Sequence, residues 1–362
     1  MSYRKRTIRK LLQLIMLALV GWGIVHSVRK SAAQLSEQRQ ALRESAAELR
    51  GRAAETADAA QAAAWLRQAE RQERAVENFW QAAPGGLAAA GGLYALGMLP
   101  ACLFWRQCLR ALEQPTHGLT IAWAYYYGNL GKYFPGKAMV ILLRLAALEP
   151  LGIQKTATSI TIFMETLTMM AVGGAMAAVC LIGLNLDWRL TLLSLGLLVA
   201  TFLPTYPPLL RWLLPRLQRG VDPAAVHTWA GRIDAKLFVR GWLWLSLTWV
   251  AFGMSLLVVL RSLPISNFEQ ADTASVVLSC WGACALAVVL GFVSLLPGGA
   301  GVREAVLSIV LAPVVGPAAA LGGAVWLRIV WLATELCMVG LLFVLRIVSK
   351  KPNAVVDRHP GI

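Results

Sequence analysis

The sequence predicts an all-α, polytopic membrane protein, a transmembrane helix bundle of about seven or eight crossings with two Pro/Gly-broken or re-entrant segments. Hydrophobic residues occupy 57% of the 362 positions and charged residues only 15%, which is more apolar than a soluble domain. Apolar stretches of about 20 residues, the length that crosses a bilayer, recur along the chain. Proline, glycine and charged residues interrupt two of the apolar regions.

The first apolar stretch covers residues 11–28 and follows a basic start, as a secretory signal would. Arg29 and Lys30 follow it, however, and no small-residue cleavage site precedes them. We therefore expect residues 1–28 to be a basic cytoplasmic N-terminus and a retained anchor. Further spans are expected at residues 86–104, 157–184, 190–214, 241–261, 273–296 and 317–346.

Between the first two spans, residues 29–80 are rich in alanine, glutamate, glutamine and arginine, all good helix formers. Three leucines spaced by seven would suit a coiled coil, but alanine fills most other heptad positions. We expect an extracytoplasmic polar helix or a helical hairpin with a break near Gly51. Residues 31–78 of this segment could contact a protein partner.

The formal net charge of +15 would suit nucleic-acid binding if the charge covered one surface. The basic residues instead cluster before the first span, in the loop at 211–240 and after the last span, as the positive-inside bias predicts for cytoplasmic loops. We expect a multi-pass protein of the inner (cytoplasmic) membrane, with no nucleic-acid partner and with the N-terminus and the 347–362 tail in the cytoplasm. Seven crossings would place the tail outside, so residues 119–148 or residues 297–316 must supply one more.

The first interruption lies within residues 119–148 and contains Asn129, Lys132, Pro135, Gly136 and Lys137. Because the residue before a proline is biased away from helix, we expect a second arm that begins near Pro135 and carries Arg144. Lys132 and Lys137 beside a helix N-terminus would attract an anion. The tyrosine triplet at 125–127 and the 14 tryptophans are expected mainly at the membrane interfaces.

The second interruption has similar chemistry, because Pro297, Gly298, Gly299 and Gly301 precede a helix that begins near Val302. Arg303 and Glu304 lie in the first turn of that helix. Backbone that leaves the helix within a membrane is tolerated only where it is buried in protein or lines a polar cavity. Two such breaks in one bundle are typical of transporters, in which they can belong to inverted repeats.

Glu165, Arg328 and Glu335 lie inside otherwise apolar spans. A charged side chain at mid-helix costs about 2.5–3.5 kcal/mol even on a lenient insertion scale, so each should face a partner or water. The six cysteines and four histidines lack the spacing of a metal, redox or catalytic site. We therefore expect no metal, no cofactor and no catalytic residue.

These features together resemble one known family. Asn129 followed by Pro135-Gly136-Lys137, Glu165, the run Pro297-Gly298-Gly299-Ala300-Gly301-Val302-Arg303-Glu304, and Arg328 are similar to the flippase-like membrane proteins related to the transmembrane domain of lysylphosphatidylglycerol synthase. The resemblance covers roughly residues 85–346 and implies movement of a lipid headgroup or lipid-linked intermediate between leaflets. Thr166 departs from the family pattern, in which an acidic-arginine pair is common. Aminoacyl transfer is not expected, because the chain ends soon after Arg346.

We therefore expect a lipid translocase, not an enzyme, that moves an anionic phospholipid or a polyprenyl-phosphate-linked headgroup through a polar cavity between the two breaks. Candidate phosphate-binding residues are Lys132, Lys137, Arg144, Arg303 and Arg328. Candidates for charge balance or proton coupling are Glu165, Glu304 and Glu335. Asn129, Pro135, Gly136, Pro297, Gly298, Gly299 and Gly301 are expected to shape the site.

Two other functions fit the residue pattern. One is a membrane-embedded transferase that acts on a lipid-linked substrate, with Glu304 or Glu165 as its base. The other is a membrane assembly scaffold that docks a partner on residues 31–78. The sequence has no Gly-x-x-x-x-Gly-Lys-Ser/Thr motif, so transport would be either energy-independent or ion-coupled.

Overall fold

The computed structural model describes residues 36–349, apart from residues 38, 79, 135–137, 185–187, 204–205, 207, 210–230, 267, 269–271 and 295. The described residues form helices and connecting turns without a strand, which confirms the all-α class. Among the described residues, five helices are long and apolar enough to cross a membrane: α3 (Pro84–Ala111), α6 (Lys155–Gly183), α10 (Ala235–Arg261), α11 (Thr273–Val293) and α13 (Pro317–Ser349). The anchor expected at 11–28 and the 347–362 tail beyond residue 349 lie outside the described residues.

Local sequence signals fix several helix starts. Pro84 stands at the first turn of α3, where its missing N–H costs no hydrogen bond. Asp234 and Asp272 cap α10 and α11 by accepting backbone N–H groups three residues on, at 2.8 and 3.2 Å. The core between α3, α6 and α10 is closed by Trp105 and Trp249, whose rings are fully buried. The long helices therefore form a packed frame around the site.

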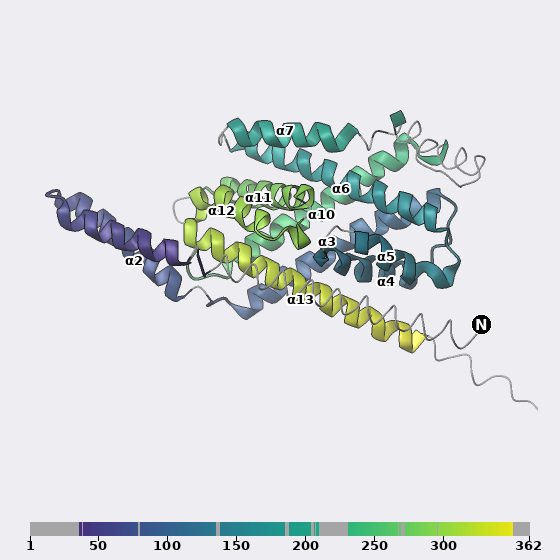
Figure 1. The fold of residues 1–362 in the computed structure, drawn as a ribbon, viewed down its shortest axis with the longest axis horizontal. Helices are drawn as coiled ribbons and strands as arrows, with labels where there is room; N and C mark the ends of the chain where they lie inside the picture. Colours follow the sequence, from purple (N-terminus) through teal and green to yellow (C-terminus); the bar gives the residue numbers. More distant parts are fainter. Residues whose placement is uncertain are drawn as a thin grey trace, which may run out of the picture.

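Helix α7 (Trp188–Phe202) corresponds to the start of the span expected at 190–214. It packs along α6 at the edge of the bundle (Figure 1). The described side chains of α7 are largely exposed and apolar, as those of a lipid-facing helix would be.

Residues 119–148 form the first broken hairpin, which consists of α4 (Gly118–Asn129), the short 3-10 helix η1 (Leu130–Tyr133) and α5 (Ala138–Leu148). Its two arms pack against each other. Gly131 allows this close approach, because a Cβ atom there would lie 2.5 Å from the backbone nitrogen of Val140. The expected re-entrant element is therefore present, with its second arm starting at Ala138.

The second broken hairpin consists of α11, the 3-10 turn η4 (Pro297–Gly299) and α12 (Val302–Val315). Gly298, Gly299 and Gly301 have positive φ angles, which reverse the chain at low cost for glycine. Arg303 of α12 then lies against Gly291 of α11. Because α12 returns along α11 (Figure 1), the break is the tip of a hairpin and not a kink in one continuous span.

The two broken hairpins enter the bundle from opposite ends. Trp123 of α4 contacts Phe343 and Arg346 near the end of α13, with ring centroids 6.1 Å apart in the first case. The second broken hairpin instead finishes at Gly316, directly before α13 begins. The tips η1 and η4 contact each other inside the bundle. A long helix, a broken hairpin and a long helix thus occur twice in chain order among the described residues.

Neither residues 119–148 nor residues 297–316 contain a helix long enough to cross a membrane in the described part of the chain, so the extra crossing expected from one of them stays a prediction. Both segments return toward the end from which they came. Residues 273–296, expected as a full crossing, form the first arm of a hairpin despite their length.

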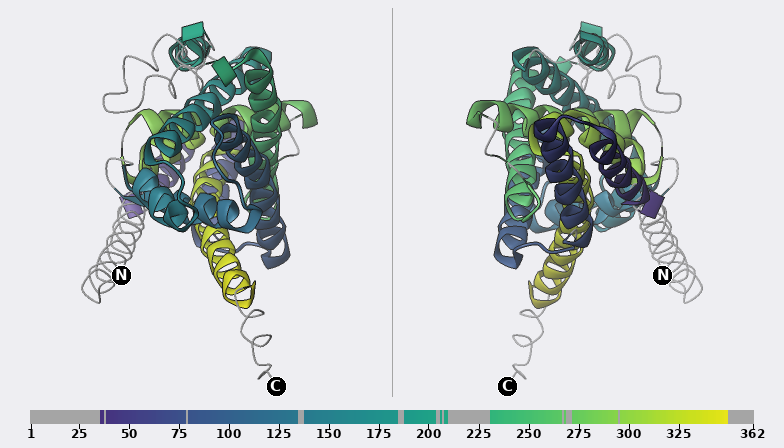
Figure 2. Two further views of the ribbon diagram at one scale, coloured as in Figure 1. Left: turned by 90° about the vertical axis from the view of Figure 1, so that its right-hand side faces the viewer. Right: turned by 90° about the vertical axis from the view of Figure 1, so that its left-hand side faces the viewer.

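Residues 39–55 and α2 (Ala59–Glu77) form an antiparallel helical hairpin, hereafter the N-terminal hairpin. Arg50 and Glu73 join its arms through an ion pair at 2.6 Å, and Ala46 and Ala69 are buried. The turn lies at residues 56–58, and Gly51 continues the first helix. The hairpin protrudes from one end of the bundle (Figure 1), faces the viewer in the right-hand view of Figure 2, and contacts the start of α13 through Leu42.

Candidate functional site

A cavity of about 430 Å³ lies where the tips of the two broken hairpins meet. Its walls are mainly apolar, but in the described part of the chain six polar or charged side chains besides tyrosines reach it from five helical elements: Asn129, Lys132, Arg144, Glu165, Thr166 and Arg303. A smaller pocket shares Lys132 and Arg303 with this cavity and adds Glu304 and Arg328 to its walls. The candidate residues of both breaks therefore converge on one place.

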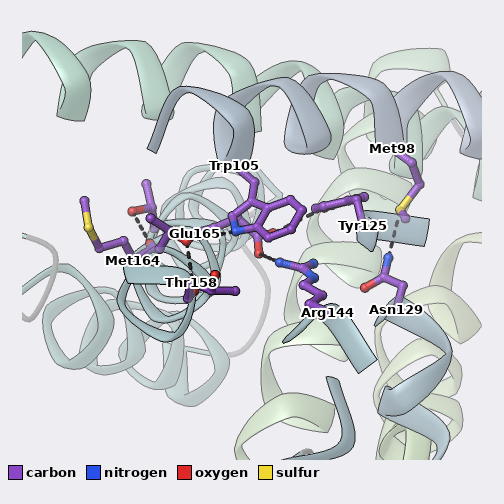
Figure 3. Close-up of polar contacts among 10 residues, drawn as sticks. Met98, Trp105, Tyr125, Asn129, Arg144, Thr158, Met164 and Glu165 are labelled. Carbon is purple, nitrogen blue, oxygen red and sulfur yellow. Dashed lines mark hydrogen bonds and ion pairs between the residues drawn. The ribbon is translucent and has the colours of Figure 1, made fainter. Parts of the chain in front are cut away.

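Arg144 of α5 and Glu165 of α6 form a fully buried ion pair at 2.9 Å. The Tyr125 hydroxyl also donates to Glu165, at 3.2 Å. The Arg144 guanidinium lies 4.5 Å from the centre of the Trp105 ring and 4.4 Å from that of Tyr125 (Figure 3). Arg144 of α5 is thus the partner of Glu165. Glu165 is therefore paired although Thr166, and not an arginine, follows it in the sequence.

Lys132 of η1 forms an ion pair with Glu335 of α13. Tyr94 donates its hydroxyl proton to the same carboxylate oxygen, and Lys132 Nζ lies 3.3 Å from the Tyr94 oxygen. Stacking on Trp331, with centroids 4.3 Å apart, holds the Tyr94 ring. Trp331 in turn donates to Ser255 at 3.1 Å. This cluster ties the tip of the first broken hairpin to α3, α10 and α13.

Glu304 of α12 accepts the backbone N–H of Gly301 at 2.7 Å and forms an ion pair with Arg328 of α13. It therefore caps its own helix and balances Arg328. Arg328 and Glu335, seven residues apart on α13, each pair with a different broken hairpin. Both hairpins are thereby anchored to the same long helix.

Arg303 forms no ion pair with any carboxylate of the described residues. Its side chain runs between Gly291 and Gly299, where added Cβ atoms would lie 2.7 Å from its Cγ and 2.8 Å from its Nε. The buried Nε atom has no hydrogen-bond partner. Because a guanidinium without a counterion is costly at this depth, the position suits a group that binds an anion.

The remaining site-shaping residues fall near the cavity where they are described. Asn129 ends α4 and lines the cavity, with its amide nitrogen 3.5 Å from the Met98 sulfur. Gly298 and Gly299 also line it, Pro297 begins η4, and Gly301 caps α12. Pro135, Gly136 and Lys137 lie outside the described residues, so the structure does not place them.

Sequence reasoning missed the aromatic members of the site. Tyr125 and Tyr126 are buried inside the bundle, so the expectation of an interface triplet was wrong for these two residues. Tyr94 and Trp331 also line the cavity and were not singled out. A signal was available for Tyr94, since a hydroxyl in mid-span needs a hydrogen-bond partner just as a charged group does.

The comparison with protein families decides the relationship. The protein-family model described as "Lysylphosphatidylglycerol synthase TM region" matches residues 59–340, which is most of the chain. The chain belongs to this family. The match begins before residue 85, where the resemblance was expected to start, and includes α2 with both broken hairpins. A search of curated proteins found no match. Membership and the apolar helices identify a multi-pass membrane protein.

Proposed function

We propose that the protein is a flippase-like lipid translocase that moves the headgroup of an anionic lipid between leaflets through the cavity at the two hairpin tips. The observation that carries the proposal is Arg303, which lines the cavity and has no carboxylate partner among the described residues. A planar guanidinium binds a phosphate through two parallel hydrogen bonds. A chloride ion or a neutral solute fits this paired arrangement less well.

The shape of the cavity supports a lipid substrate over a water-soluble anion. Phe163 of α6 lines the cavity and is also 55% exposed on the outer surface. Val140 and Ile141 of α5 line the same side. The cavity therefore reaches the surface of the bundle between α5 and α6. A lipid could place its headgroup at Arg303 while its chains stay in the bilayer.

The arrangement of the hairpins supports access from both leaflets. Each broken hairpin comes from a different end of the bundle, and their tips share the site. In this proposal the N-terminal hairpin is extracytoplasmic, the end of α13 is cytoplasmic and the protein resides in the inner membrane, consistent with the clusters of basic residues. Small movements of either hairpin would open the site toward one leaflet.

The geometry favours transport over the transferase hypothesis. Glu304 and Glu165, the two candidate bases, are held in ion pairs with Arg328 and Arg144. To act on a substrate, either carboxylate would have to leave its guanidinium, and both groups would then be charged and unpaired inside the protein. We therefore assign these carboxylates to charge balance within the cavity.

Reconstitution into liposomes that contain a fluorescent phospholipid tests the proposal. A membrane-impermeant reductant quenches label in the outer leaflet only, so translocation appears as loss of the remaining signal. We expect faster loss with the protein than in protein-free vesicles, and no uptake of glycerol phosphate into the same vesicles. Vesicles that take up glycerol phosphate without moving any tested lipid would overturn the proposal.

A further inference from the structure

The charged groups around the cavity are nearly balanced. Four cations, Lys132, Arg144, Arg303 and Arg328, line the cavity and its adjoining pocket. Three carboxylates, Glu165, Glu304 and Glu335, are paired with three of these cations. Among the described residues the site thus carries one uncompensated positive charge, on Arg303.

We propose that this charge balance makes the site selective for a single phosphodiester, a phosphate group that carries one negative charge. This inference rests on the proposed function and specifies its substrate. One phosphodiester neutralises Arg303 and leaves the described residues around the cavity without excess charge. A diphosphate or a phosphate monoester brings a second negative charge. Each remaining cation of the described residues around the cavity is already paired with a carboxylate.

Binding a second negative charge would have to break an existing ion pair. Lys132 is the most accessible candidate, because its side chain is 21% exposed while Arg144 is 2% exposed. Withdrawing Lys132 would leave Glu335 as a buried carboxylate, and one of its oxygens already has no hydrogen-bond partner. An unpaired buried charge is strongly unfavourable, so the site should reject dianions.

The selected chemistry has two natural sources. Glycerophospholipids with a headgroup alcohol are phosphodiesters, and so are sugars linked to a polyprenol through one phosphate. Asn129 and Thr166 line the same cavity and offer hydrogen bonds to headgroup hydroxyls of either source. Polyprenyl diphosphates and phosphatidic acid fall outside the class, because each carries more than one charge at pH 8.

Equilibrium binding to the full-length protein in detergent tests this selectivity. The probes are phosphatidylglycerol, a polyprenyl-phosphate-linked sugar, phosphatidic acid and a polyprenyl diphosphate, each titrated at pH 8 and followed by native mass spectrometry. We expect the better-bound phosphodiester to bind at least about tenfold more tightly than either dianion. The phosphodiester that binds more tightly identifies the source.

A charge-shifted variant provides the decisive comparison. Glu335→Gln adds one positive charge, so it should improve phosphatidic acid binding relative to phosphatidylglycerol by about tenfold. Arg303→Gln should remove phosphodiester binding, while Arg261→Gln, at an exposed position at the end of α10, should change neither probe. If Glu335→Gln does not fold, the wild-type ratios and Arg303→Gln still decide the question.

Equal affinity of the wild type for phosphodiesters and dianions would overturn the inference, as would an unchanged ratio in folded Glu335→Gln. These failures differ from failure of the proposed function. Translocation of phosphatidic acid and phosphatidylglycerol at equal rates would reject the selectivity and retain the translocase. Selective binding without any lipid movement would reject the translocase and retain the site.

Discussion

Replacing Glu165 with glutamine will lower the free energy of unfolding by about 3–5 kcal/mol, because it leaves the Arg144 guanidinium buried without a counterion. Tyr125 keeps a hydrogen-bond acceptor in this variant, so the loss reports mainly on the charge. Equilibrium unfolding in mixed micelles with increasing SDS, followed by tryptophan fluorescence, measures the change.

A matched control separates burial from simple pairing. Glu70 pairs with Arg74 at 3.0 Å on the exposed surface of α2, so Glu70→Gln should cost less than about 1 kcal/mol. Removing both charges with Arg144→Met and Glu165→Leu should recover most of the stability that Glu165→Gln loses. Equal costs for Glu165→Gln and Glu70→Gln would show that the α5–α6 pair is not buried as described.

Replacing Arg303 with glutamine will reduce phospholipid translocation at least about tenfold, since charge-assisted hydrogen bonds contribute roughly 1.5–3 kcal/mol. Its stability should stay the same or increase, because the substitution removes a charge that has no counterion among the described residues. A substitution that merely damages the fold would lower both translocation and stability. A fall in translocation without a fall in stability therefore identifies a role in binding. Initial rates in the liposome assay and SDS unfolding of the same preparation supply the two numbers.

Arg261→Gln is the control for Arg303→Gln, because it also removes one positive charge but lies at the exposed end of α10. It should leave translocation unchanged. An Arg303→Gln protein that moves lipid at the wild-type rate would remove the phosphate-binding assignment, whatever its stability.

The sequence alone predicted the helical class and both breaks. Proline, clustered glycines and charged groups within apolar stretches indicate a broken helix inside a membrane protein, because unsatisfied backbone groups are too costly against lipid. The sequence could not predict that α11 returns as α12. Both arms are apolar, and the 21 residues of α11 satisfy the length of a full span. Only packing against neighbouring helices distinguishes the two outcomes.

The partners within the site were also beyond sequence reasoning. Lys132 and Glu335 are 203 residues apart, and the hairpin tip that joins them has no local signature of that contact. Glu304 is adjacent to Arg303 in sequence, but its carboxylate points toward the N-terminal backbone that it caps. The three ion pairs distinguish Arg303 from Lys132, Arg144 and Arg328, because each of those cations has a carboxylate partner. Composition alone could not make this distinction.

The central claim is that the tips of the two broken hairpins form one site for an anionic lipid headgroup. Photocrosslinking with phosphatidylglycerol that carries a diazirine in its headgroup, followed by peptide mass spectrometry, tests it most directly. We predict adducts on both tips, at residues 129–133 and 298–303, that unlabelled phosphatidylglycerol suppresses and that Arg303→Gln lacks. Adducts confined to lipid-facing surfaces such as α7, unaffected by Arg303→Gln, would contradict the claim.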